Sequence, residues 1–126
     1  MSRMGYETII VEKKDAVGRI TLNRPSALNA INDAMGEELN SALKEIEKDE
    51  KTRCLVITGA GRAFCAGEDV SGLKERYGGG SQPSLGDHLR KKYHPMILRI
   101  RNMEKPVIAR LNGMAAGSGA SLALAC

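Results

Sequence analysis

Two glycine-rich loops hold the residues whose types and spacing could do chemistry. The first loop runs from Gly59 to Asp69 and the second from Asn112 to Ser121, and each follows an apolar stretch typical of a buried strand. Small residues let a ligand approach the backbone closely, and N–H groups at a helix start are unpaired and lie at its positive end. Two such loops on neighbouring strands could place two N–H groups around one oxygen, which is an oxyanion hole.

Other glycine-loop sites fit these residues poorly. The first loop begins Gly-x-Gly, but Phe64 stands where a dinucleotide fingerprint needs its third glycine. No Gly-Lys-Ser/Thr follows, which excludes a phosphate-binding P-loop. A purely structural alternative stays open, in which both loops are tight strand-to-helix turns.

The elements that position these loops indicate an α/β domain. A strand, a helix and a strand follow one another at the spacing of a βαβ unit, which predicts a sheet that is at least partly parallel. The apolar spacing and capping residues predict strands over Glu7–Lys13, Arg19–Asn23 (a hairpin turning at Asp15–Gly18), Cys54–Thr58 and Lys105–Asn112, and helices from Asn32 or Asp33 to about Lys48, over Asp87–Met103 and from near Ser118.

Five local features refine this expectation. Cys54–Thr58 is almost wholly apolar, as in a strand buried on both faces. A short helical stretch is expected near Asp69–Glu75, and the glycine-rich Tyr77–Gly86 segment is expected to be a surface loop or lid. Pro95 predicts a kink or a late start in the helix that contains it. The apolar Ser118–Cys126 helix needs cover on all sides, so we expect residues 1–126 to be the N-terminal part of one domain, cut short.

The composition is that of a folded protein with an aliphatic core. The 126 residues suffice for one domain, and 42% are hydrophobic while only 3% are aromatic. The formal net charge of +4 would favour an anionic ligand, although a solvated surface with a few extra lysines explains it more simply. The scarcity of aromatic side chains argues against nucleic-acid binding.

Cysteines and hydropathy point to a cytoplasmic protein without a metal site. Cys54, Cys65 and Cys126 are odd in number and lack Cys-x-x-Cys spacing, which favours reduced thiols over a zinc site or disulfides. No apolar run approaches the roughly 20 residues of a membrane helix, and the first residues lack the apolar stretch of a signal peptide. We therefore expect no metal and no membrane partner.

Three segments together resemble the enoyl-CoA hydratase/isomerase, or crotonase, superfamily. They are GRITLNRPSALNAIN (Gly18–Asn32), LVITGAGRAFCAGEDV (Leu55–Val70) and KPVIARLNGMAAGSG (Lys105–Gly119), which occur in order and span most of the chain. The resemblance implies the N-terminal portion of a crotonase-like ββα spiral. It also implies an acyl-CoA thioester as substrate, no separate cofactor because CoA is part of that substrate, and a homotrimer or hexamer.

The same resemblance assigns roles to particular residues. The N–H groups of Ala66 and Ser118 would hold the thioester oxygen as an enolate forms. Ala27 and Leu28, with the segment Ala66, Gly67, Glu68, Asp69 and Val70, would line the path of CoA. Asp69 is expected to order its own loop and cap the next helix rather than perform chemistry.

One position departs from the family pattern and favours isomerisation over hydration. Hydratases of this family use two glutamates, and the first belongs three residues after Ser118, where this chain has Ser121. A hydroxyl cannot serve as a carboxylate acid/base near neutral pH, whereas a proton shift between two carbons needs only one shuttling group. Ala115–Leu124 is similar to the corresponding segment of 1,2-epoxyphenylacetyl-CoA isomerases, in which the catalytic acid lies further along the chain, beyond Cys126.

The remaining polar residues are interpreted as non-catalytic. Glu68 is expected to be a solvated loop carboxylate, and Cys65 lacks a histidine to activate it. His88 and His94 are expected on the surface. Arg90, Lys91 and Lys92 could meet CoA phosphates but read better as a solvated basic face.

Three functions therefore stay open. The first is an acyl-CoA isomerase or hydratase, in which the isomerase is favoured. The second is a catalytically silent acyl-CoA-binding homologue, because these residues include no acid/base in a recognised catalytic position. The third is a role in interaction or assembly. Turnover of 2-enoyl-CoA against 3-enoyl-CoA separates the first from the others.

Overall fold

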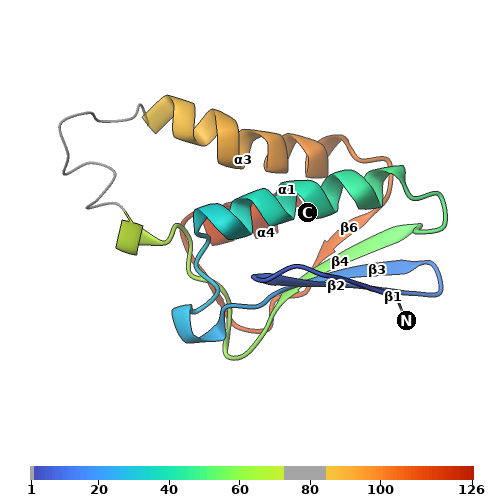
Figure 1. Ribbon diagram of the computed structural model, residues 1–126, viewed down its shortest axis with the longest axis horizontal. Helices are drawn as coiled ribbons and strands as arrows, with labels where there is room; N and C mark the ends of the chain where they lie inside the picture. The colour runs from blue at the N-terminus through green and yellow to red at the C-terminus, as the bar shows by residue number, and fades with distance from the viewer. Residues whose placement is uncertain (1, 73–84) are drawn as a thin grey trace.

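A five-stranded mixed sheet forms the base of the molecule in the computed structural model, which describes residues 2–72 and 85–126 (Figure 1). Its strand order is β1-β2-β3-β4-β6. The strands are β1 (Ser2–Met4), β2 (Ile9–Lys14), β3 (Val17–Leu22), β4 (Cys54–Gly59) and β6 (Val107–Ala109). The sequence pattern gave no sign of β1, which pairs antiparallel with β2.

The hairpin of β2 and β3 is present but turns more tightly than expected. Lys14 pairs with Val17, so the loop is only Asp15 and Ala16, not the four residues expected. Asp15 takes a positive φ of 55°, which aspartate tolerates better than most residues. The tighter turn sets the register in which Ile9, Val11, Ile20 and Leu22 share the buried face.

The expected βαβ unit is confirmed. β3 and β4 pair in parallel, and α1 (Asp33–Lys48) connects them. β4 also pairs in parallel with β6. Asn32 caps α1 as expected, because its side-chain oxygen accepts a hydrogen bond of 2.8 Å from the Met35 N–H.

The helices α1, α3 (Leu85–Asn102) and α4 (Ser118–Ala125) all lie on one side of the sheet (Figure 1). α3 runs through Pro95 without a break, so its late start is excluded. The buried face of α1 is the apolar stripe expected from its spacing. The core of buried side chains between sheet and helices includes Ile20, Leu22, Leu39, Leu43, Ile46, Leu55, Ile57, Phe64 and Met96.

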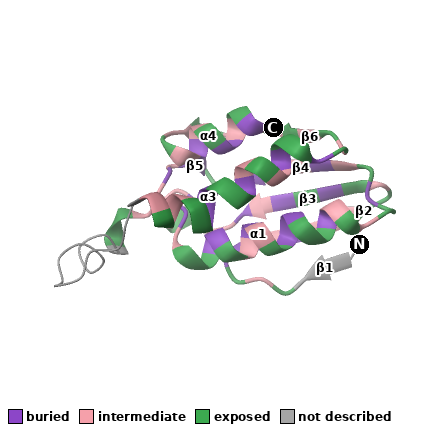
Figure 2. Cartoon of the chain, turned by 90° about the horizontal axis from the view of Figure 1, so that it is seen from above, coloured by how far each residue is buried: buried purple, intermediate pink, exposed green. Residues whose placement is uncertain are grey.

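Burial differs from the expectation at β4 and β6, whereas α4 lacks cover as its apolar sequence predicted. Leu55 and Ile57 of β4 are fully buried, but Cys54 and Val56 are only half-buried, because none of the described helices covers the opposite face of the sheet. β6 is shorter than expected, and its Ile108 is 50% exposed. Figure 2 shows buried, intermediate and exposed positions on α4, and its Leu124 is 82% exposed.

Two further short strands lie inside the glycine-rich loops. β5 (Ala63–Cys65) and β7 (Met114–Ala115) form a separate two-stranded sheet, where an irregular loop was expected. A 3-10 turn, η2 (Val70–Gly72), begins the helical stretch expected near Asp69, and the rest of that stretch lies outside the described residues. The expected lid also lies mostly outside them, although Leu85 and Gly86 belong to α3. None of the described helices is long and apolar enough to cross a bilayer.

Candidate functional site

The two glycine-rich loops lie side by side because β5 and β7 pair. The pairing is parallel, with Ala63 opposite Met114 and Cys65 opposite Ala115. Just beyond it, the Ala116 N–H donates to the Cys65 carbonyl at 3.0 Å. The segments that follow the two strands therefore leave the pair in contact with each other.

The loops approach most closely at two glycines. Gly67 has a φ of +108°, and a Cβ added there would lie 2.9 Å from the Ala116 carbonyl oxygen and 3.5 Å from the Ser118 nitrogen. Gly117 has a φ of +54°, and a Cβ added there would lie 3.9 Å from the Gly67 Cα. Side chains rarely tolerate such φ values. At Gly67 the conformation and the contact both require glycine.

Ser118 presents a backbone donor at this junction. It is the first residue of α4, where a helix leaves its N–H groups without intrahelical partners. No acceptor for the Ser118 N–H lies within residues 2–72 and 85–126. The helix dipole adds partial positive charge at this point, so the N–H suits an oxygen that carries or develops negative charge.

The Ala66 N–H, expected to be the other donor, is already hydrogen-bonded. It donates to the Leu28 carbonyl at 3.0 Å, so the expectation of an open donor at Ala66 is wrong. The cause is the turn η1 (Pro25–Ala27), after which Leu28 adopts a left-handed conformation with φ of 52°. Residue spacing gave no sign that this turn would lie against the first loop.

The first loop then continues as a short strand-like segment along Ile31. The Ile31 N–H donates to the Gly67 carbonyl at 2.7 Å, and the Asp69 N–H donates to the Ile31 carbonyl at 2.9 Å. This is a parallel bridge between Ile31 and Glu68. The residue between two such bonds turns its own N–H away from the partner segment, so the Glu68 N–H points away from Ile31.

The residues expected to line the CoA path come from two segments that these bonds hold together. Ala27 and Leu28 end the η1 turn, and residues 66–70 form the end of the first loop. The Leu28–Ala66 bond joins one segment to the other. Val70 is 68% exposed.

Asp69 orders its own loop, as expected. One of its carboxylate oxygens accepts from the Ser71 N–H at 2.9 Å and from the Ser71 hydroxyl at 2.6 Å. The other pairs with the Arg24 guanidinium at 3.0 Å. The Ser71 hydrogen bonds, and then Arg24, hold the pKa of Asp69 below its ordinary value. Asp69 is therefore held as a structural carboxylate.

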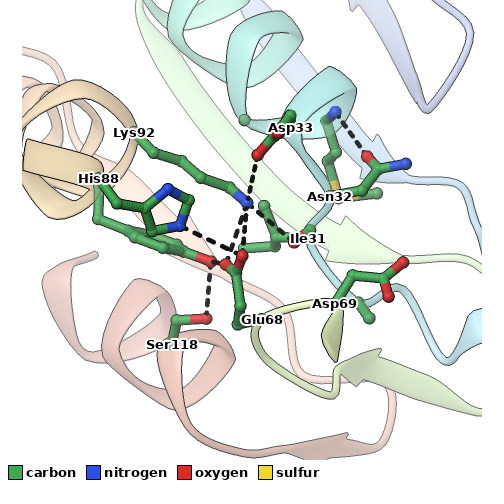
Figure 3. A network of polar contacts seen from close by, with 12 residues as sticks. Ile31, Asn32, Asp33, Glu68, Asp69, His88, Lys92 and Ser118 are labelled. Carbon is green, nitrogen blue, oxygen red and sulfur yellow. Dashed lines mark hydrogen bonds and ion pairs between the residues drawn. The ribbon is translucent and has the colours of Figure 1, made fainter. Parts of the chain in front are cut away.

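Glu68 is not the solvated carboxylate that the sequence predicted. Its side chain is only 24% exposed, and both of its oxygens lie 3.0 Å from the Lys92 ammonium (Figure 3). The Tyr93 hydroxyl donates to the same carboxylate, and His88 lies 3.3 Å from it. Helix α3 thus delivers three polar side chains to one residue of the first loop.

The expectation for the basic face of α3 is accordingly wrong in part. Lys92 is only 6% exposed and also donates to the Ile31 carbonyl at 3.1 Å. His88 is 14% exposed, whereas His94 lies on the surface as expected. Arg90 and Lys91 are solvated, as expected of that face. Nothing in the local sequence distinguishes Lys92 from Lys91, because Glu68 lies 24 residues away.

Two asparagines that the sequence reasoning missed hold the first loop in shape. The side-chain amides of Asn29 and Asn112 both donate to the Ala63 carbonyl, at 2.9 and 3.0 Å. Asn112 also accepts from the Gly59 N–H at 3.0 Å. Asn29 is completely buried. A buried amide with every group bonded fixes the backbone around it, so these two residues position the loop.

The remaining candidates supply no nucleophile, acid or metal ligand set. Ser121 lies exposed on α4. Cys65 is buried, and burial raises the pKa of its thiol, which keeps the sulfur protonated. The described residues contain no group of three or more histidine, cysteine or acidic side chains that could hold a metal ion.

Comparison with known proteins identifies the family. The family model described as Enoyl-CoA hydratase/isomerase matches residues 12–126. Among curated proteins, the chain is 44% identical to a 1,2-epoxyphenylacetyl-CoA isomerase of Escherichia coli, over 94% of this chain and 45% of that protein. It is 42% identical to a probable enoyl-CoA hydratase of Rhodobacter capsulatus, over 97% of this chain and 45% of that protein.

The fold agrees with these matches. The structure superposes on an enoyl-CoA hydratase/isomerase from Xanthobacter autotrophicus with a TM-score of 0.85 and 34% identity, over 97% of this chain and 45% of that one. The chain thus spans about half the length of the proteins that it matches. Its α/β architecture is that of crotonase-like proteins. The chain belongs to the enoyl-CoA hydratase/isomerase family.

Proposed function

We propose that the protein is an acyl-CoA isomerase in which backbone N–H groups at the junction of the two loops hold the thioester oxygen. The observation that carries this proposal is the Ser118 N–H at the head of α4, 3.5 Å from the point where Gly67 would carry a Cβ. A donor at that point stabilises the negative charge that develops on the oxygen when a proton leaves the neighbouring carbon.

For the first loop, we assign the donor to Glu68 rather than Ala66. The Ala66 N–H donates to the Leu28 carbonyl. The Glu68 N–H, in contrast, is turned away from Ile31 by the parallel bridge between these two residues. The assignment moves the donor two residues along the loop, past the positive φ of Gly67.

Isomerisation is proposed over hydration because of Ser121. Hydration needs proton transfer to carbon and activation of water, for which a serine hydroxyl is a poor acid or base near neutral pH. An isomerase needs one shuttle for one proton. Identity alone does not separate the two, since the isomerase and hydratase relatives are 44% and 42% identical to this chain.

Glu68 is not proposed as that shuttle. Lys92 pairs with both of its oxygens, and Tyr93 donates a further hydrogen bond. These three hydrogen bonds hold both carboxylate oxygens in place. Its side chain is better suited to holding the loop than to taking a proton from carbon.

The acyl-CoA is proposed to run between the η1 turn and the end of the first loop, along Ala27, Leu28 and residues 67–70. The family implies acyl-CoA substrates. We also propose a cytoplasmic trimer or hexamer, for which the test is the mass of the whole protein by light scattering. A monomer that turns over substrate would contradict the assembly.

The test of function compares two substrates with the whole protein. A 3-enoyl-CoA should be converted to its 2-enoyl isomer, while hydration of crotonyl-CoA should be slow or absent. Robust hydration would overturn the isomerase assignment. Tight binding of acyl-CoA without turnover of either substrate would show instead that the protein is a catalytically silent homologue.

A further inference from the structure

A polar cluster joins four segments beside the junction of the loops. Its members include Glu68 from the first loop, Ser118 from the head of α4, and the backbone before α1 at Ile31 (Figure 3). Helix α3 adds Lys92, Tyr93 and His88. The β5–β7 pairing holds the bases of the two loops. The cluster includes Glu68 and Ser118, the two residues whose N–H groups are the proposed donors.

Tyr93 is the member that touches both loops. Its hydroxyl donates to the Glu68 carboxylate and accepts from the Ser118 hydroxyl at 3.3 Å. The ring is buried, with 9% of its surface exposed. Burial and then the Glu68 carboxylate raise the pKa of Tyr93. The phenol therefore keeps its proton at neutral pH and stays a donor to Glu68.

The Glu68 end of this link is held firmly. Lys92 pairs with both carboxylate oxygens at 3.0 Å and donates to the Ile31 carbonyl at 3.1 Å. Its stem crosses α1 where Gly36 leaves room, since a Cβ there would lie 2.9 Å from the Lys92 Cγ. A buried ion pair with additional hydrogen bonds has little freedom to rearrange. Tyr93 consequently bonds to a fixed carboxylate on one side.

The Ser118 end of the link is the head of a helix. Ser118 is bonded through its hydroxyl to Tyr93, while its N–H is the proposed donor to the thioester oxygen. A side-chain bond at this residue restricts the motion of the first turn of α4, which frays easily. The orientation of the N–H then depends on a phenol that α3 provides.

We propose that Tyr93 is a positioning residue that sets the separation of the two loops by linking Glu68 to Ser118. This inference rests on the proposed function, because it concerns the donor in that site. Tyr93 does not touch the reacting atoms. Its loss leaves the acyl-CoA path intact but loosens the oxyanion site, so the rate of the chemical step falls more than substrate binding.

The test measures kcat and KM of the whole protein for Tyr93→Phe, Ser118→Ala and the double variant. Each single variant removes one hydroxyl of the same link and keeps the Ser118 N–H. Each should lower kcat about tenfold, as expected for one hydrogen bond, with KM changed less than twofold. The double variant should be no slower than either single one, because the link is already broken.

Tyr6→Phe is the matched control. It also removes a tyrosine hydroxyl bonded to a serine, since the Tyr6 hydroxyl lies 3.4 Å from Ser41 Oγ, but it does so away from the loops. Its kcat should equal that of the unmodified protein. If Tyr93 only fills the core, Tyr93→Phe should change thermal stability and leave kcat per folded molecule unaltered.

The results separate this inference from the proposed function. Unchanged kcat in Tyr93→Phe, or additive losses in the double variant, would overturn the positioning role. If Tyr93→Phe does not fold, Ser118→Ala still breaks the link from the other side, and unchanged kcat there overturns the role equally. Ser118→Pro removes the N–H itself, so an active Ser118→Pro protein would refute the proposed site instead.

Discussion

Gly67 and Gly117 face each other across the junction of the two loops, both with positive φ, and a Cβ on Gly117 would lie 3.9 Å from the Gly67 Cα. The contact brings the end of the first loop to the head of α4. Any side chain at Gly67 would push the loops apart, because the Ala116 carbonyl lies 2.9 Å from the position of its Cβ. This glycine pair therefore limits how closely the Glu68 N–H and the Ser118 N–H can approach each other.

Gly67→Ala should lower both stability and catalysis. A non-glycine residue held at this φ costs about 1–3 kcal/mol, and the added methyl displaces the second loop. We expect a lower midpoint of urea unfolding and a lower kcat. Gly5→Ala is the control, since a Cβ there meets nothing within 4 Å. Wild-type kcat in a folded Gly67→Ala protein would show that the loop contact does not matter for chemistry.

Ser121→Glu should raise the hydration of crotonyl-CoA above background. The change restores a carboxylate three residues after Ser118, at a position on α4 where the present side chain is exposed in the described chain. Isomerisation of a 3-enoyl-CoA should change less. Product analysis by chromatography distinguishes the two reactions. Hydration that stays at background in a variant that still isomerises would show that Ser121 is not what limits hydration.

The Asp69 contacts predict acid-sensitive stability in the first loop. The folded pKa lies below the ordinary value of 3.8, because Ser71 and Arg24 favour the charged form. The unfolded chain thus binds the proton first as pH falls. The stabilisation is fully present above the unfolded pKa and is lost as pH drops through the folded pKa.

Asp69→Asn measures this effect. The difference in unfolding free energy between the unmodified protein and Asp69→Asn should be constant near neutral pH and shrink below about pH 4. Glu45→Gln, on the exposed side of α1, serves as the control. A difference that grows in acid would mean that the Asp69 carboxylate is destabilising in the folded protein.

Residues 1–126, produced alone, should associate in solution. Large apolar side chains are exposed on consecutive elements near the second loop: Ile108 at 50%, Leu111 at 57%, Met114 at 48% and Leu124 at 82%. Exposed apolar surface of this kind drives association. Light scattering and a thermal scan test the prediction. A monodisperse monomer with a sharp transition would contradict it.

Local signals sufficed for much of the fold. The Asn32 cap, the apolar stripe of α1 and the start of α4 near Ser118 follow from neighbouring residues, and each was predicted. The parallel pairing of β3 and β4 followed from the βαβ spacing. β5 and β7 were missed because two- and three-residue strands carry no periodic pattern.

The details of the candidate site depended on contacts between distant residues. Ala66 looked like an open donor until the left-handed turn at Leu28 placed a carbonyl beside it. Glu68 looked solvated because Lys92 and Tyr93 approach from a helix 24 and 25 residues away. Such pairs depend on how the η1 turn and α3 lie against the first loop, which residue spacing within any one segment does not encode.

The most direct test of the thioester-oxygen site is deuterium exchange at C2 of a saturated acyl-CoA, such as butanoyl-CoA, followed by NMR in heavy water. Exchange requires formation of the enolate, but it requires neither addition of water nor transfer of the proton to a second carbon. Proline fits the first turn of a helix, so Ser118→Pro should keep α4 and remove only the donor and the hydroxyl. It should slow exchange by about 10²–10³, whereas Ser118→Ala should stay within about tenfold of the unmodified protein. Exchange at the unmodified rate in Ser118→Pro, or no exchange by a protein that binds butanoyl-CoA, would contradict the account.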